Sequence, residues 1–194
     1  MKYVLASGNR GKLAELQAML ASTNMELVSQ SEFNIPEAVE DGSSFEENAI
    51  IKARHASRLT GLPAIADDSG LSVDALDGEP GIYSARYAGE GATDADNVKK
   101  LLAALETVPD HERTARFQCV IALVRNGDDP EPELFRGTWE GSITREPAGE
   151  NGFGYDPVFF VPERQRTAAE LDAQTKNSLS HRARAIRLLQ AWLL

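Results

Sequence analysis

The chain has 194 residues, 42% of them hydrophobic and 26% charged, which is typical of one globular domain with a full core. Its formal net charge of −10 argues against a surface that tracks DNA or RNA, because such surfaces need excess basic residues. The single cysteine, Cys119, rules out an internal disulfide, and its apolar surroundings predict a buried thiol. No secretory signal opens the sequence, and no apolar run approaches the roughly 18 residues of a membrane span, so we expect a cytoplasmic protein.

Strand and helix patterns follow one another along the chain. Ser44 and Glu47 predict a capped helix start, and Gly61 predicts the end of the same helix. In chain order we expect a strand over residues 2–6, a three-turn helix around residues 13–20, a strand over 26–29, helices over 44–60 and 93–106, strands over 115–125 and 134–144, a short strand over 158–161 and a closing helix over 179–194. This order predicts an α/β fold with a long mixed central sheet flanked by helices.

The most informative segment is Asp67-Asp68-Ser69-Gly70, which follows the apolar run 63–66. The pattern is typical of a strand that delivers acidic side chains into a loop at a sheet edge, where open α/β sheets bind ligands. Two neighbouring carboxylates repel each other, and they are tolerated best beside a hard cation such as Mg²⁺ or where one acts as a base. A solvated turn rich in Asp, Ser and Gly explains these four residues equally well.

A second polar segment, Ser7-Gly8-Asn9-Arg10-Gly11-Lys12, connects the first strand to the first helix. A glycine-rich turn at that position exposes backbone N–H groups at the positive end of the helix, which favours a phosphate. Lys12 adds a cation in the first helical turn. The spacing differs from that of a Walker A loop, and a purely structural turn is an alternative.

Glu40 and Lys52 could join the same site. Glu40 precedes the helix of residues 44–60 and could add an oxygen ligand for Mg²⁺, and Lys52 on that helix could neutralise phosphate oxygens. The alternative is a surface turn followed by a solvated helix face.

Residues 152–157, Gly-Phe-Gly-Tyr-Asp-Pro, form a third polar segment. An aromatic ring between two glycines could stack on a base, whereas the alternative is a tight turn with its aromatic rings in the core. Lys176 and residues 180–182, Ser-His-Arg, place further cations near the start of the closing helix. In so acidic a chain, this concentration of cations in polar segments indicates an anionic ligand.

Taken together, the segments resemble the inosine/xanthosine triphosphate pyrophosphatase family. The resemblance covers almost the whole length, and the motifs that carry it occur in the family's order: SGNRGK, SFEENAIIKARHA, ADDSGL, GEPGIYSARYAG, GFGYDPVF and SHRA. Ser7 stands where relatives also carry Thr, which preserves the hydroxyl.

The resemblance implies hydrolysis of non-standard purine nucleoside triphosphates (ITP, dITP and XTP) to the monophosphate and pyrophosphate, which removes them from the nucleotide pool, with Mg²⁺ required. It implies that residues 1–194 form a single catalytic domain with two lobes, with the active site in the cleft between them. It also implies a homodimer, and the net charge and the lack of a long apolar run predict that the protein binds neither nucleic acid nor a membrane.

Roles are carried over from the family by position. Asp68 would be the catalytic base that activates water, and Glu40 and Asp68 would bind the metal. The residues that would hold the triphosphate are Ser7, Gly8, Asn9, Arg10, Gly11, Lys12 and Lys52. Ser69 would contact the substrate, and the base pocket would comprise Phe153, Gly154, Tyr155, Asp156, Lys176, His181 and Arg182.

Two other functions could use the same residues. A phosphatase with an Asp nucleophile fits paired acids after a strand, but that chemistry usually needs D-x-D spacing, whereas Asp67 and Asp68 are adjacent and would point alternately in an extended chain. A nucleotide-sensing module would bind ITP-like ligands without hydrolysis, and its acidic cluster would then need a bound metal beside the triphosphate. Analysis of the reaction products separates these three functions.

Overall fold

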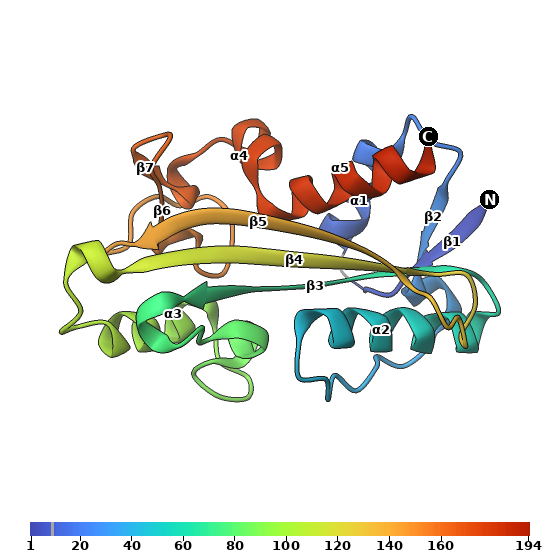
Figure 1. Cartoon of the computed structure of the whole chain (residues 1–194), viewed down its shortest axis with the longest axis horizontal. Helices are drawn as coiled ribbons and strands as arrows, with labels where there is room; N and C mark the ends of the chain where they lie inside the picture. Colours follow the sequence, from blue (N-terminus) through green and yellow to red (C-terminus); the bar gives the residue numbers. More distant parts are fainter. Residues whose placement is uncertain (9) are drawn as a thin grey trace. The chain divides into compact units, whose positions relative to one another are not determined.

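One mixed β-sheet runs through the part of the chain that this computed structural model describes, residues 1–8 and 10–194 (Figure 1). Its seven strands lie in the order β2-β1-β3-β4-β5-β6-β7. β1 pairs in parallel with β2 and β3, whereas β6 pairs antiparallel with β5 and β7, so the predicted mixed sheet is confirmed. The strand bounds are β1 Lys2–Leu5, β2 Glu26–Ser29, β3 Ala64–Val73, β4 Thr114–Val124, β5 Glu133–Ile143, β6 Phe159–Val161 and β7 Arg166–Thr167.

Helices flank the sheet, and most of them begin where the sequence predicts. Ser44 accepts a hydrogen bond from the Glu47 N–H at the start of α2, and Thr93 and Asp96 form a reciprocal capping box at the start of α3. Gly61 ends α2 with a φ of 70°. These contacts satisfy backbone groups that helix ends leave unpaired. The helix bounds are α1 Arg10–Leu20, α2 Phe45–Thr60, α3 Asp94–Ala104, α4 Ala173–Leu179 and α5 His181–Leu193.

The closing helix differs from the single helix predicted over residues 179–194. Here α4 ends at Leu179 and α5 begins at His181. Ser180 between them is extended, with φ −60° and ψ 156°, and its hydroxyl accepts a hydrogen bond from Ala183 N. Because this is the side-chain contact of an N-cap, a new helix starts after Ser180.

The prediction of a loop at residues 67–70 is wrong, because these residues lie inside β3, a continuous strand of ten residues. Both aspartates have a lysine partner, which removes the repulsion that would favour a solvated turn. The predicted location is nevertheless close: β1 ends at Leu5, opposite Ile65, so residues 67–70 lie just beyond the carboxyl end of β1. Open parallel sheets bind ligands at such ends.

The chain divides into two compact units, and the first comprises Met1–Asp68, Cys119–Gly137 and Arg184–Leu194. In this unit α1 and α5 lie on one side of the strands and α2 lies on the other (Figure 1). Cys119 is 1% exposed, which confirms the predicted buried thiol. The core under α1 and α5 includes Leu5, Leu16, Leu20, Ile65, Ile121 and Leu189.

The second unit comprises Ser69–Gln118 and Thr138–Ala183 and has a core of its own. The Phe159 ring packs against Phe117 and Trp139, with centroid distances of 4.5 and 5.3 Å. The assignment of residues 1–194 to one catalytic domain stays a prediction. Over the described residues, no helix has the length and apolar character needed to cross a membrane.

Candidate active site

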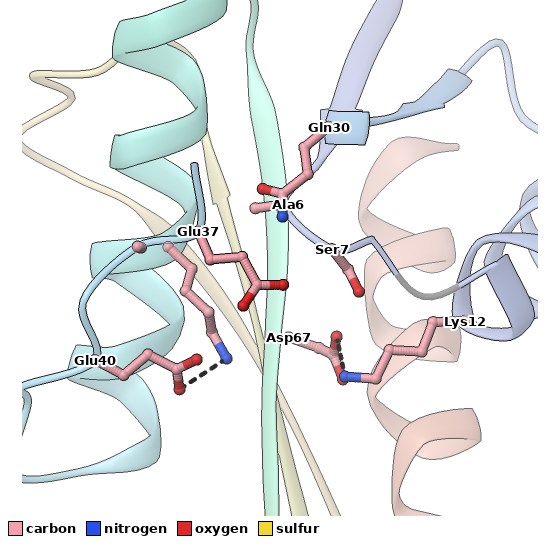
Figure 2. A pocket seen from close by; sticks show the side chains of 9 residues that line it. Ala6, Ser7, Lys12, Gln30, Glu37, Glu40 and Asp67 are labelled. Carbon is pink, nitrogen blue, oxygen red and sulfur yellow. Dashed lines mark hydrogen bonds and ion pairs between the residues drawn. The ribbon is translucent and has the colours of Figure 1, made fainter. Parts of the chain in front are cut away.

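A small polar pocket of about 130 Å³ lies in the first unit, where residues that follow β1 and β2 meet α1, α2 and β3 (Figure 2). Side chains of both charges gather in it from segments far apart in the sequence. The lining residues are Ala6, Ser7, Lys12, Gln30, Glu37, Ala38, Glu40, Lys52 and Asp67. The two lysines make this small pocket suitable for an anion. The carboxylates beside them would suit a metal ion that is bound to the same anion.

Lys12 and Asp67 form the first ion pair of the pocket. The Lys12 ammonium donates hydrogen bonds to both carboxylate oxygens of Asp67, at 3.0 Å each, and Figure 2 shows the two side chains directed toward each other. The Asp67 side chain is only 2% exposed, so its charge is desolvated and needs this partner. Asp67 therefore holds the Lys12 ammonium at the pocket.

Lys52, in the middle of α2, lies between two carboxylates. Its Nζ is 3.2 Å from Glu40 Oε2 and 3.1 Å from Asp68 Oδ1, so the structure brings together three residues that the sequence predicts for one site. Burial alone would lower the pKa of Lys52, but the negative charges of Asp68, Glu40 and Asp67 raise it above its ordinary value. Lys52 is therefore a permanent cation at neutral pH.

Asp68 has one carboxylate oxygen in this ion pair and a second oxygen that stays available. Asp68 Oδ2 is buried and has no hydrogen-bond partner among the described residues. Burial raises the pKa of Asp68 above its ordinary value, and the charge of Lys52 offsets this only in part. Because a buried oxygen without a donor is costly, Oδ2 is suited to hold a cation or to accept a proton.

The carboxylates of Glu40 and Asp68 fit a divalent cation. Mg²⁺ prefers oxygen ligands and is usually held by one or two carboxylates together with substrate phosphates. Among the described residues, no group of three or more His, Cys, Asp or Glu side chains is arranged to hold a metal ion. A magnesium site here would therefore be completed by oxygens of the substrate.

The two adjacent aspartates reach different lysines because of strand geometry. Successive side chains of a strand point to opposite faces. Asp67 pairs with Lys12 of α1 and Asp68 pairs with Lys52 of α2, and these helices lie on opposite sides of the strands (Figure 1). The predicted alternation of Asp67 and Asp68 is thus confirmed.

Two pocket residues, Gln30 and Glu37, were not identified from the sequence. Gln30 directly follows β2, which is parallel to β1. Because the carboxyl ends of parallel strands lie at one edge of a sheet, the polar residues after β2 were a signal that could have indicated Gln30. No comparable signal pointed to Glu37.

The segment that carries Glu37 and Glu40 is attached to α2. His55 Nε2 lies 2.8 Å from Pro36 O, and Gly42 N donates a hydrogen bond of 2.9 Å to the Asn48 side chain. A Cβ at position 42 would approach that amide oxygen to 2.6 Å, so glycine is needed there. These contacts explain how residues without regular secondary structure place Glu40 beside Lys52.

The second unit carries the predicted base-pocket residues around Phe153. This residue is 61% exposed and lies between Gly152 and Gly154, whose φ angles of 80° and 62° favour glycine. Lys176 Nζ lies 4.8 Å, and Arg182 Cζ 6.0 Å, from the centroid of the Phe153 ring. An exposed ring with two cations beside it can contact both the face and the edge of a flat heterocycle.

Asp156 fixes this loop from within. It is 3% exposed, and its Oδ2 accepts hydrogen bonds from Phe153 N at 2.8 Å and from the Lys176 ammonium. A Cβ on Gly152 would come within 2.1 Å of that oxygen, so only glycine fits there. Asp156 thus positions both the ring and one of its cations.

Four of the predicted base-pocket residues are buried, namely Tyr155, Asp156, His181 and Arg182, the last with 6% exposure. Tyr155 is 4% exposed and donates its hydroxyl to Ser84 O at 2.8 Å. His181 is 8% exposed, and its ring stacks on Phe117 with a centroid distance of 4.9 Å. These are contacts of core residues, and a direct contact of either side chain with a base stays a prediction.

The remaining predicted residues divide between the two units. Ser7 lines the pocket of the first unit, and Ser69 is the first residue of the second unit. Asn9 lies outside the described residues, as do the side chain of Arg10 and the surroundings of Gly11.

Known relatives match almost the whole chain. A model of the Ham1 family matches residues 3–192. The dITP/XTP pyrophosphatase of Vibrio cholerae is 58% identical over 188 residues, which cover 97% of this chain and 94% of that protein. The dITP/XTP pyrophosphatase of Coxiella burnetii is 55% identical over 193 residues, which cover 100% of this chain and 96% of that protein.

Solved structures give the same result. The structure of a HAM1 protein from Coxiella burnetii superimposes with a TM-score of 0.96 at 55% identity, covering 100% of this chain and 98% of that one. The Staphylococcus aureus Ham1 protein gives a TM-score of 0.92 at 45% identity, with the same coverage. On the evidence of sequence, fold and full-length coverage, the chain belongs to the Ham1 family.

Proposed function

We propose that the chain hydrolyses non-standard purine nucleoside triphosphates, namely ITP, dITP and XTP, to the monophosphate and pyrophosphate. The observation that carries this proposal is the position of Lys52 between Glu40 and Asp68, together with the second, partner-free buried oxygen of Asp68 among the described residues. The names of the relatives support the substrate class. Such hydrolysis would remove these nucleotides from the pool.

The pocket of the first unit would bind the triphosphate. Lys12 and Lys52 would neutralise phosphate oxygens there, beside the start of α1. Glu40 and Asp68 would hold Mg²⁺. When bound, this ion neutralises phosphate charge and lowers the pKa of water.

Asp68 would accept the proton of the attacking water. The water oxygen forms a bond to the α-phosphorus, its proton passes to the Asp68 carboxylate, and the bond from the α-phosphorus to the departing pyrophosphate breaks. The raised pKa of Asp68 makes it a stronger base than a solvated carboxylate. The two lysines stabilise the charge on the departing pyrophosphate.

The cluster of the second unit would select the base of the same nucleotide. The Phe153 ring can stack on a purine, and Lys176 and Arg182 carry only hydrogen-bond donors, which suit the 6-keto oxygen of hypoxanthine or xanthine. Adenine presents an amino donor at that position. Two facing donors leave both groups unpaired, so ATP should be a poor substrate.

The homodimer that the resemblance implies and the cytoplasmic location expected from the sequence belong to the same proposal. The net charge of −10 argues against nucleic acid as a partner.

A panel of ITP, dITP, XTP, GTP and ATP with Mg²⁺, scored for pyrophosphate, orthophosphate and monophosphate, tests the proposal. We expect equal amounts of pyrophosphate and monophosphate from ITP, dITP and XTP, and ATP turnover lower by orders of magnitude. Release of orthophosphate would indicate a phosphatase, and tight binding without turnover would indicate a sensing module. Equal turnover of ATP would contradict the base-pocket assignment.

A further inference from the structure

Gln30 is a mostly buried residue whose amide opens into the pocket and has no hydrogen-bond partner among the described residues. Gln30 is 6% exposed and lines the pocket of the first unit. Its amide makes no hydrogen bond to any other residue within the described part of the chain. Figure 2 shows the amide directed into the pocket, toward Ala6. Because this amide lines the pocket and is not engaged by the described residues, its donors and acceptor are open to a ligand.

The neighbours of Gln30 contact the segment that follows β1. Ser29 Oγ donates a hydrogen bond of 3.0 Å to Ser7 O. On the other side, a Cβ on Gly8 would lie 3.4 Å from Ser31 Oγ. Gln30 therefore lies between two residues that approach Ser7 and Gly8, and it lines the same pocket as Ser7 and Lys12.

We propose that the Gln30 amide binds the pyrophosphate portion of the substrate, which makes Gln30 a further substrate-binding residue. This inference rests on the proposed function. The amide nitrogen carries two donors, which match phosphate oxygens. Gln30 and Lys12 line the same pocket, and Figure 2 shows both side chains directed into it. The amide would therefore add a donor beside the two lysines proposed to bind the departing pyrophosphate.

Three variants test this role: Gln30→Leu, Gln30→Glu and the matched control Gln190→Leu. Gln190, on α5 in the same unit, already donates a hydrogen bond to Ser22 Oγ and does not line the pocket. The binding of inorganic pyrophosphate and of IMP is measured by calorimetry with Mg²⁺ present, and thermal unfolding is followed in parallel.

Gln30→Leu should weaken pyrophosphate binding by about 10- to 100-fold, the effect of losing hydrogen bonds to a charged group. Gln30→Glu should weaken it further, because a carboxylate repels phosphate. IMP affinity should stay unchanged in both variants, and Gln190→Leu should match the wild type. Since the amide has no partner to lose in the described protein, Gln30→Leu should not lower the unfolding temperature.

Unchanged pyrophosphate affinity in Gln30→Leu would overturn the inference, as would an equal loss for IMP. A clear fall in the unfolding temperature would show a structural role instead, and a wild-type protein that does not bind pyrophosphate would also refute it. The titration requires no turnover, so it is independent of the proposed reaction. Binding of pyrophosphate that depends on Gln30, without pyrophosphate release from ITP, would contradict the proposed reaction and leave the binding role of Gln30 intact.

Discussion

Asp67 and Asp68 are neighbours in sequence with different chemical environments. Asp67 has both oxygens engaged by Lys12, and its side chain is almost fully buried. Asp68 shares one oxygen with Lys52, and its other oxygen has no partner among the described residues. A carboxylate held by a bidentate ion pair positions its lysine, whereas one with a free oxygen and a raised pKa can take up a proton.

Asp68→Asn should lower the rate of pyrophosphate release from ITP by about 100- to 10,000-fold, because an amide cannot accept the proton of water. The fold should survive. Burial raises the pKa of Asp68 in the folded protein, so at neutral pH the charged carboxylate destabilises the folded state. As the pH falls from the pKa of Asp68 in the folded protein toward its lower pKa in the unfolded chain, the carboxylate becomes protonated and the folded state becomes more stable. The amide side chain of the Asp68→Asn variant is uncharged, so its burial does not carry the cost of desolvating a charge. The unfolding temperature at pH 7 should therefore not decrease.

The control for this prediction is Asp128→Asn. Asp128 pairs with Arg58 in the same unit, but its side chain is 86% exposed and lies outside the pocket. The Asp128→Asn variant should therefore be as active as the wild type. Stopped assays with ITP and thermal melts at pH 7 and pH 5 provide the measurements. Substantial residual turnover of Asp68→Asn would remove Asp68 from the role of base, and early unfolding at pH 7 would show that the charge is structurally required.

At the scale of elements, helix α3 helps to hold the loop that exposes Phe153. Gly154 N donates a hydrogen bond of 2.7 Å to Asp94 Oδ2, and Asp94 is the first residue of α3. The capping box between Thr93 and Asp96 fixes that end of the helix. Asp94, at the start of α3, is thus a positioning residue for the Phe153 ring.

Asp94→Ala should raise the KM for ITP by about 3- to 10-fold with a small change in kcat, since one hydrogen bond that orders the Phe153 loop is lost. Asp94→Asn retains an oxygen that can accept the Gly154 N–H and should restore most of the affinity. Steady-state kinetics on ITP and calorimetry with pyrophosphate measure both effects. An equal rise in KM for both variants would contradict the proposal that the Asp94 oxygen holds the Phe153 loop. Weaker pyrophosphate binding would show that the effect of Asp94 is not limited to the base pocket.

Element ends with local signals could be predicted from the sequence, whereas features set by distant partners could not. Ser44, Thr93 and Gly61 act on backbone groups within a few residues, so their caps are visible in the sequence. The strand through residues 67–70 depends on lysines 55 and 16 positions away, which neutralise the two aspartates. No local rule includes such partners, and the carboxylates alone favour a turn.

The candidate site shows the same division. Motif positions such as Glu40, Lys52 and Asp68 were identified, and the structure brings them together. Tyr155 was assigned to the base pocket with its motif, but its hydroxyl bonds to Ser84, 71 positions earlier, and the side chain is buried. Whether a side chain in a motif faces a ligand or the core depends on packing partners that a single sequence does not reveal.

At the scale of the molecule, each unit has its own core and its own polar cluster. The boundary falls within β3, so Asp68 ends the segment of the first unit and Ser69 begins that of the second. The first unit carries the lysines and carboxylates suited to phosphate and metal, and the second carries the ring and cations suited to a base. Under the proposed function, a ligand with only phosphate groups should therefore bind the first unit, and a ligand with only a base should bind the second.

Hydrogen exchange with partial ligands tests this assignment. Inorganic pyrophosphate with Mg²⁺ should slow exchange at the start of α1, at residues 29–31 and at 64–68, and leave residues 152–156 unchanged. Inosine, which has no phosphate, should slow exchange at 152–156 and at the start of α5. A ligand protects the amides whose local opening it opposes, so each fragment reports the segment that binds it.

Two variants make the experiment reciprocal. Phe153→Ala should abolish protection by inosine and retain protection by pyrophosphate, because the ring contacts only the base. Lys12→Met combined with Asp67→Asn, which leaves no buried carboxylate without its cation, should have the opposite effect, since it removes a cation proposed to bind phosphate and leaves the second unit unaltered. Protection of residues 152–156 by pyrophosphate as strong as that by inosine would refute the division of labour between the units. If each ligand protects only its expected unit, and each variant removes protection only in the unit that it alters, base recognition and phosphate binding are separable properties of this fold.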